Sequence, residues 1–243
     1  MKKIVFVLLI LLSQAYAFGQ WAIPANMRAE NTLDRMSDKG GLSNSDILYG
    51  VPGEPGGVVG DVYLNKRWNN ATILLYQSEV MIEGYPVKYD IKSNLIEIKS
   101  NTGIKVLDVK KIKNMVWKDS TTTLLHYFVN GNEYKKDGTP HSGLLEVLVD
   151  GMIPLLKKTQ IFVKQPTYND AMGSGSKDFK IYQKPTIFYS KDGELFEIKN
   201  KKDVLEASGN LTKEVEDYIK ANKLNLNKDA GMKRTFEFIN SKL

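Results

Sequence analysis

The chain contains 243 residues, among them 34 Lys and Arg, 28 Asp and Glu, and no cysteine. The absence of cysteine excludes disulfide bonds, and it also excludes a bacterial lipoprotein anchor, whose acyl chains are carried by a cysteine. Folding must therefore rely on the burial of apolar side chains, and a chain of this length has enough of them.

The first residues have the pattern of a secretory signal peptide. A positive pair, Lys2-Lys3, precedes nine consecutive apolar residues, and Ala15 and Ala17 occupy the two positions where a signal peptidase accepts small side chains. We predict a signal peptide over residues 1–17, with cleavage between Ala17 and Phe18. Nine apolar residues are too few to cross a membrane as a helix, which takes about 20 residues.

Export restricts the location and the partners of the mature chain. Cleavage after Gly19 satisfies the same rule, and with either cut we expect a protein of the periplasm, the outer membrane or the cell surface. We expect no nucleic-acid partner there, and loss of the two positive charges of Lys2 and Lys3 lowers the net charge from +6 to +4. No later apolar run approaches the length of a spanning helix, so we predict no transmembrane segment after removal of the signal.

Residues 18–60 are predicted to form an irregular leader. Its second half, Ser37–Gly60, contains seven Gly and two Pro, and a segment so rich in these residues does not form a regular helix or strand. The leader is either a linker or an extended strap across the body, and its composition does not distinguish the two.

From Asp61 the pattern becomes that of β-strands. Val87–Ile91 alternates apolar and charged residues, which gives a strand one apolar and one polar face. Further apolar segments begin near residues 95, 104 and 112, with turn-forming residues between them. Strands that start every eight or nine residues are typical of an antiparallel meander.

Two turn pairs predict hairpins after the meander. Asn130-Gly131 follows an apolar segment and can take the positive φ angles of a type I′ turn. Asp150-Gly151 lies between Leu144–Val149 and Met152–Leu156. Pro154 implies that its strand is an edge or bulged there, because proline has no N–H for the ladder.

The last part of the chain predicts one more hairpin and then helices. A strand over Gln160–Val163 and a loop over Asn169–Lys177 precede a hairpin whose turn contains Asp192-Gly193. Asn200 is a predicted cap of the first helix, with Asp203 at the third helical position, and Asn227 is a predicted cap of the last. Apolar residues at helical spacing lie between these caps, over residues 211–222, and again from Met232 to the end.

Together these patterns predict an α+β protein that is mainly β. An antiparallel meander, in a sandwich or half-barrel, is followed by a hairpin and about three short helices. We place the β body over residues 61–183 and the hairpin with its helical appendage over residues 184–243. Because helices of this length are not stable alone, we expect the appendage to pack on the body.

No catalytic, cofactor-binding or metal-binding constellation is recognised. His126 and His141 are not spaced like the histidine pair of a metalloprotease helix, and no cysteine can complete a zinc site. We interpret His141 as a solvated turn residue. The Asp-Gly pairs lack the acids of a calcium loop, and Gly173–Lys177 lacks the spacing of a phosphate loop. Paired catalytic carboxylates cannot be recognised without geometry.

Lysines on and beside the meander form one candidate ligand-binding surface. If they share one face, they could bind an anionic polysaccharide or lipopolysaccharide. The alternative is that they keep strands from pairing with other chains, and acids such as Asp90 and Glu97 lie among them. The candidate residues are Lys88, Lys92, Lys99, Lys105 and Lys113.

Four strand-and-turn segments and the end of the signal share a pattern with known sequences. They are Gly60–Asn65, Val87–Ile91, Leu145–Gly151, Leu155–Lys158 and Ala17–Gln20. In these segments the chain resembles exported proteins of unknown function from Bacteroidota, over most of residues 60–240. The resemblance implies a cell-envelope setting in a bacterium with two membranes. It implies no activity and supplies no functional residues.

We therefore expect an exported cell-envelope protein, without evident catalysis and without a cofactor, that binds a protein partner or a surface polymer. One alternative is a periplasmic carrier that shelters a lipid-like ligand beneath its C-terminal helices, which requires a continuous apolar cavity. Another is a hydrolase of glycan or peptide, which requires a concave site with convergent carboxylates, His126 or His141.

Overall fold

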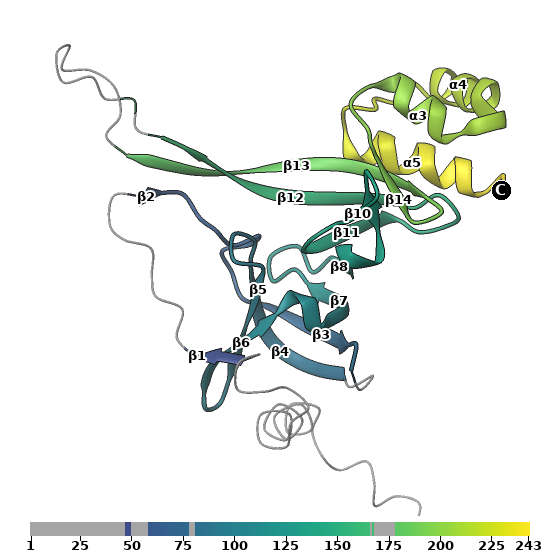
Figure 1. Cartoon of the computed structure of the whole chain (residues 1–243). Coiled ribbons are helices and arrows are strands. Elements are labelled where there is room, and N and C mark those ends of the chain that lie inside the picture. Colours follow the sequence, from purple (N-terminus) through teal and green to yellow (C-terminus); the bar gives the residue numbers. More distant parts are fainter. Residues whose placement is uncertain (1–46, 50–57, 78–80, 166, 168–177) are drawn as a thin grey trace, which may run out of the picture.

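The structure is a computed structural model, and it describes residues 47–49, 58–77, 81–165, 167 and 178–243 (Figure 1). The predicted signal peptide, nearly all of the predicted leader and the predicted loop over 169–177 lie outside the described residues. Strands dominate the described chain, and three α-helices follow the last strand. These features confirm a mainly β protein with a short helical C-terminal part.

The described elements are the following, in chain order. The strands are β1 (Ile47–Tyr49), β2 (Val58–Val59), β3 (Asn69–Leu75), β4 (Met81–Asp90), β5 (Leu95–Ser100), β6 (Gly103–Asp108), β7 (Ile112–Lys118), β8 (Leu125–Asn130), β9 (Lys135–Lys136), β10 (Thr139–Pro140), β11 (Leu144–Val149), β12 (Leu155–Lys164), β13 (Phe179–Lys191) and β14 (Glu194–Glu197). The helices are α3 (Lys201–Ala207), α4 (Thr212–Ala221) and α5 (Asp229–Asn240), and the short 3-10 turns are η1 (Val109–Lys111), η2 (Gly131–Glu133) and η3 (Gly209–Leu211).

All strands of the described chain belong to one sheet, which is antiparallel except where β2 lies beside β13 and β9 beside β14. β3 to β6 pair in chain order, as short turns between strands predict. β7 does not continue this order, because it returns to pair with β3. β8, β11, β12 and β13 then extend the sheet on that side. β3 and β7 therefore lie in the middle of the sheet.

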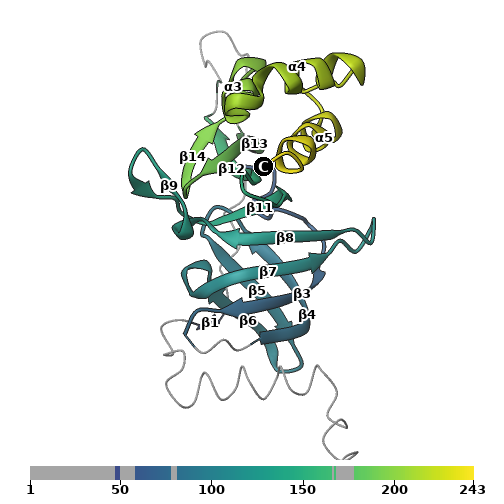
Figure 2. The same ribbon diagram turned by 90° about the vertical axis from the view of Figure 1, so that its right-hand side faces the viewer.

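One face of β3 to β8 carries the main core. Val87 and Tyr89 in β4 are buried, as are Ile96 and Ile98 in β5, which confirms the alternation predicted for these strands. The cluster also contains side chains from β3, β6, β7, β8 and β11 and Val109 of η1, and within the described residues it contains no side chain from an α-helix. The sheet therefore curves around its own apolar face (Figure 2).

The predicted type I′ turn at Asn130-Gly131 is wrong. Asn130 has a φ of −70° and is fully buried. Its side-chain amide donates hydrogen bonds to the carbonyl oxygens of Val109 and Ile112, at 2.9 and 2.6 Å. These hydrogen bonds hold the backbone of Asn130 in an extended conformation. The chain then passes through η2, β9 and β10 before β11 pairs with β8.

The other two predicted hairpins are confirmed. β11 pairs with β12 across Asp150-Gly151, and β12 begins directly after Pro154. The register shifts between Val147 and Val149, so the expected irregularity lies on the strand opposite the proline. β13 pairs with β14 across Asp192-Gly193, where both residues have positive φ, 52° and 79°.

β12 and β13 form a long ribbon of ten residue pairs, from Leu155↔Tyr189 to Lys164↔Lys180. Its inner half belongs to the body. Its outer half, Gln160–Lys164 with Lys180–Lys184, projects away from the body, and we call it the arm (Figure 1). The predicted boundary between residues 183 and 184 thus lies inside β13, because the ribbon joins the two predicted parts.

The three helices gather at one end of the sheet (Figure 2). The predicted cap of α3 is confirmed, with Asn200 and Asp203 forming a reciprocal capping box. The predicted cap of α5 is wrong, because the residue directly before the helix is Lys228 and not Asn227. The Lys228 side chain makes no capping hydrogen bond. The apolar stripes of the helices pack together and against β11, β12 and β13. Among the described helices, none has the length and apolar character needed to cross a membrane.

Candidate functional site

A row of side chains on the core face of the sheet forms a pocket beside the helices. Opposed residues in a pleated sheet point to the same face, so side chains from five adjoining strands converge there. The opposed pairs are Trp117↔His126, Phe128↔Glu146, Glu146↔Lys157 and Lys157↔Ile187.

The pocket has a volume of about 590 Å³, within the range of ~300–1,000 Å³ found for small-ligand sites. Its rim comes from two parts of the chain that are far apart in sequence. Leu64 and Asn65 precede β3, whereas Asn227 and Asp229 lie at the start of α5. The body and the helical appendage therefore both contribute to this site.

Glu146 links two nitrogen-bearing side chains in the pocket. Its Oε1 accepts a hydrogen bond from His126 Nδ1 at 2.7 Å, and its Oε2 lies 2.6 Å from Lys157 Nζ. Burial by itself raises the pKa of the Glu146 carboxyl, but the hydrogen bonds from Lys157 and His126 outweigh burial and lower this pKa. Glu146 is therefore ionised. It fixes Nδ1 of His126 as a donor and leaves Nε2 as the second functional nitrogen.

Trp117 supplies an indole N–H that lacks a partner. The side chain is 3% exposed, and its ring meets the rings of His126 and Phe128 edge-on, with centroids 6.4 and 5.0 Å away. Among the described residues, no acceptor lies within hydrogen-bond distance of Trp117 Nε1. A buried donor without an acceptor costs about 1–3 kcal/mol. Trp117 also lines the pocket, and a ligand that reached this N–H with a carbonyl or hydroxyl oxygen would remove that cost.

Asp119 contributes an ordered carboxylate. Its Oδ1 accepts the backbone N–H groups of Thr121 and Thr122, both at 2.7 Å, and its Oδ2 accepts from Asn65 Nδ2 at 3.1 Å. The backbone hydrogen bonds from Thr122 and Thr121 hold the pKa of Asp119 below its usual value. The carboxylate is thus a fixed acceptor for a ligand hydroxyl or N–H group.

These groups suit a polar ligand that carries no negative charge. Lys157 is paired with Glu146, and the remaining polar groups are the carboxylates of Asp119 and Asp229 together with hydroxyl, amide, imidazole and indole groups. In the part of the chain that the structure describes, no three His, Asp or Glu side chains are placed to hold a metal ion. Sequence reasoning singled out His126 here, but not Glu146 or Lys157. The sequence feature that could have identified Glu146 and Lys157 is a charged residue on the core-facing side of a predicted strand.

The five lysines of the predicted anionic-ligand face do not lie together. Lys88 and Lys99 share one face of β4 and β5, because Lys88 lies opposite Glu97. Lys105 lies opposite Ile98 on the other face and is only 4% exposed. Lys92 follows the end of β4, and Lys113 is in β7, which β3 separates from β4. The register of the sheet, which linear spacing does not give, separates these side chains.

His141 is outside the pocket, and the interpretation of a solvated turn residue is wrong. Its backbone N–H donates to the Tyr134 carbonyl, and its ring lies against Phe188, with centroids 5.7 Å apart. These contacts bury Nε2, which has no hydrogen-bond partner among the described residues. Burial, and then the charges of Lys158 and Lys136, lower the pKa of His141.

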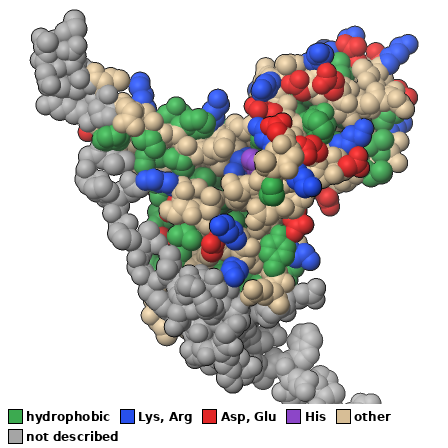
Figure 3. Space-filling model, in the orientation of Figure 1, with side chains coloured by type: hydrophobic (Ala, Val, Ile, Leu, Met, Phe, Trp, Pro, Cys, Tyr) green, Lys and Arg blue, Asp and Glu red, His purple; other side chains and the backbone are tan. Residues whose placement is uncertain are grey.

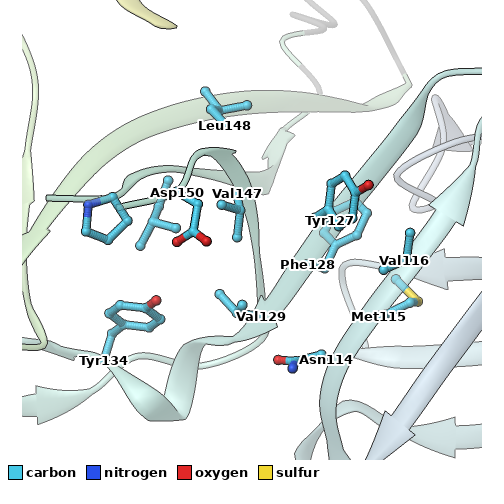
Figure 4. A pocket seen from close by; sticks show the side chains of 12 residues that line it. Asn114, Met115, Val116, Tyr127, Phe128, Val129, Tyr134, Val147, Leu148 and Asp150 are labelled. Atoms are coloured by element: carbon cyan, nitrogen blue, oxygen red, sulfur yellow. The ribbon is translucent and has the colours of Figure 1, made fainter. Parts of the chain in front are cut away.

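A second hollow of about 520 Å³ lies on the opposite face of the same strands (Figure 4). Tyr127 and Val147 are opposed across β8 and β11, and with Val129 and Tyr134 they give it a mainly apolar lining. No residue of α3, α4 or α5 lines this hollow. It is therefore not the cavity beneath the helices that a lipid carrier requires, and the helices fill that space with their own apolar side chains.

No protein-family model, curated protein or solved structure matches this chain.

Proposed function

We propose that the chain is an exported cell-envelope protein that binds a neutral, polar segment of a surface polymer in the pocket at Trp117, His126 and Glu146. Sugars and short peptides have the required hydroxyl and amide groups. The observation that carries the proposal is Trp117, which lines a pocket of small-ligand size and whose buried N–H has no acceptor among the described residues. The envelope location rests on the predicted signal over residues 1–17.

The curvature of the sheet supports this use. In the proposal, the curved sheet is the half-barrel of the sequence prediction, and the pocket lies where its core face meets the helices. The side chains that would touch a ligand lie on strands, and Glu146 holds two of them through hydrogen bonds of 2.6–2.7 Å. Because these side chains are already held in place, a ligand would not have to order them on binding, and the entropic cost of binding is smaller.

Calorimetric titration with two defined probes tests the proposal. We expect tri-N-acetylchitotriose or trialanine to bind, and Trp117→Phe to weaken binding on the order of tenfold, because the N–H donor is lost while a smaller aromatic ring remains. Trp68→Phe is the matched control, since Trp68 stacks with Lys88 outside the pocket, at 5.0 Å. Absence of binding by both probes, or an equal loss in the two variants, would overturn the proposal.

A hydrolase in the same pocket is the second candidate. The hydrogen bond of 2.7 Å between His126 Nδ1 and Glu146 favours it, because a carboxylate that orients a histidine is a common arrangement for a general base. Mass spectrometry of the same probes after incubation separates the two functions. Cleavage products that disappear in His126→Gln would establish hydrolysis, whereas intact probes after incubation with the unaltered protein would exclude it for these compounds.

A further inference from the structure

The arm presents a second surface, on the face of β12 and β13 opposite to the one that packs on the body. Ile161 and Ile181 lie on the body-facing side, where Ile161 packs against the main core and Ile181 is buried. The residues of the other face are opposed in pairs, so they point the same way, and all are exposed. The pairs are Gln160↔Lys184, Phe162↔Tyr182 and Lys164↔Lys180.

Two aromatic rings lie among the lysines of this face. Phe162 and Tyr182 stack with their centroids 5.7 Å apart, and Lys184 Nζ lies 5.8 Å from the centre of the Phe162 ring. The two aromatic residues are 39% and 51% exposed. Large exposed apolar groups that gather on one surface mark an interaction site. Figure 3 shows hydrophobic and lysine side chains side by side along the arm.

The charge of the arm has one sign. β12 and β13 contain no Asp or Glu, and among the described residues no carboxylate pairs with Lys164, Lys180 or Lys184. Three exposed lysines that have no carboxylate partner among the described residues complement an anionic surface.

The outer end of the ribbon is apolar on both faces. Val163, on the opposite face from Phe162, is 44% exposed, and Phe179 at the start of β13 is 40% exposed. A polymer chain lying on the arm would cover one face. A lipid interface that received the outer end of the ribbon would cover both. The distribution of apolar groups therefore favours a membrane over a soluble polyanion.

We propose that the arm docks the protein on a membrane surface that contains anionic lipids. Phe162 and Tyr182 enter the headgroup region, where aromatic rings are favoured. Lys164, Lys180 and Lys184 extend to the lipid phosphates, with their alkyl chains against the rings. This docking does not depend on the ligand proposed for the pocket.

Flotation of the purified protein with vesicles tests the docking. We expect little binding to phosphatidylcholine alone, and salt-sensitive binding when about one lipid in four is phosphatidylglycerol. The triple variant Lys164→Gln, Lys180→Gln, Lys184→Gln should reduce binding tenfold or more, on the order of the effect expected for three lysines. The matched control is Lys99→Gln, Lys113→Gln, Lys118→Gln, which removes the same charge from exposed positions of the body and should leave binding within about twofold.

A second variant separates the aromatic contribution from the charge. Phe162→Ser with Tyr182→Ser should remove the part of the binding that persists at high salt, since screening acts on the lysines and not on the rings. Equal binding to neutral and anionic vesicles would overturn the proposal, as would an equal loss in the arm and body triple variants. Binding to soluble dextran sulfate with none to vesicles would also overturn it, in favour of a polymer.

Discussion

The two halves of the β12–β13 ribbon contain the same residue type in opposite circumstances. In the inner half, Lys157 pairs with Glu146, and Lys158, only 6% exposed, donates a hydrogen bond to the Ser142 carbonyl at 2.6 Å. In the arm, the lysines are exposed, and no carboxylate of the described chain pairs with them. A buried lysine must find its partner inside the protein, so it serves the fold. An exposed and unpaired lysine is available to a partner outside.

Glu146→Gln is expected to have the largest effect on stability, because it breaks the pairing in the inner half. The change leaves Lys157 partly buried without its counter-charge, and it weakens the hydrogen bond to His126. We expect the free energy of unfolding to fall by about 3 kcal/mol in urea denaturation at neutral pH. Glu216→Gln on α4 is the control, because Glu216 also lies 2.7 Å from a lysine, Lys201, but at the surface. Equal effects of the two changes would show that burial does not matter here.

The contrast between buried and exposed lysines can also be tested through the pH dependence of stability, because Lys158 is buried. Burial lowers its pKa from 10.5 to about 8. Between these two pH values the unfolded chain binds more protons than the folded one, so stability should rise with pH, by up to about 3 kcal/mol. Below pH 8 both states are protonated and the destabilisation is constant.

The measurement is the free energy of unfolding of the unaltered protein and of Lys158→Met, at several pH values between 7 and about 10. The unaltered protein should gain stability relative to the variant as pH rises through this window. Lys99→Met, at an exposed position, is the matched control. Parallel curves for Lys158→Met and the unaltered protein would refute the effect of burial.

The arm lysines should have the smallest effect on folding. We expect the triple variant Lys164→Gln, Lys180→Gln, Lys184→Gln to change the free energy of unfolding by less than about 0.5 kcal/mol, since exposed and unpaired side chains stabilise little. The same urea denaturation measures it. A large destabilisation would give these lysines a structural role and remove the contrast between the two halves.

Local sequence signals predicted local structure well. The hairpin at Asp192-Gly193 and the capping box of Asn200 and Asp203 depend on residues within a few positions of each other, and both are confirmed. Asn130-Gly131 has an equally good turn signal. The prediction fails there because the buried Asn130 side chain bonds to carbonyl groups about twenty residues earlier in the chain, a contact that no local pattern contains.

The pocket and the arm depend on register, which the sequence does not state. Glu146 meets His126 and Lys157 only because β11 lies between β8 and β12 in one particular alignment. Lys105 is buried for the same reason, since its strand places it opposite Ile98. The pairing of β7 with β3 could not be predicted either, because the spacing of turns predicts that strands pair in chain order.

The close contact at Gly60 determines how the protein is best attached to a sensor or labelled. Gly60 has a φ of +126°, and a Cβ there would lie 2.1 Å from the Ile181 carbonyl oxygen, so the backbone passes directly against the arm. β2, just before it, pairs with the first residues of β13. The last residue, Leu243, follows α5 on the opposite side of the molecule from the arm (Figure 1). A fluorophore or surface linker at Leu243 therefore leaves the arm unobstructed, whereas one placed near Val58 would compete with vesicles for the arm.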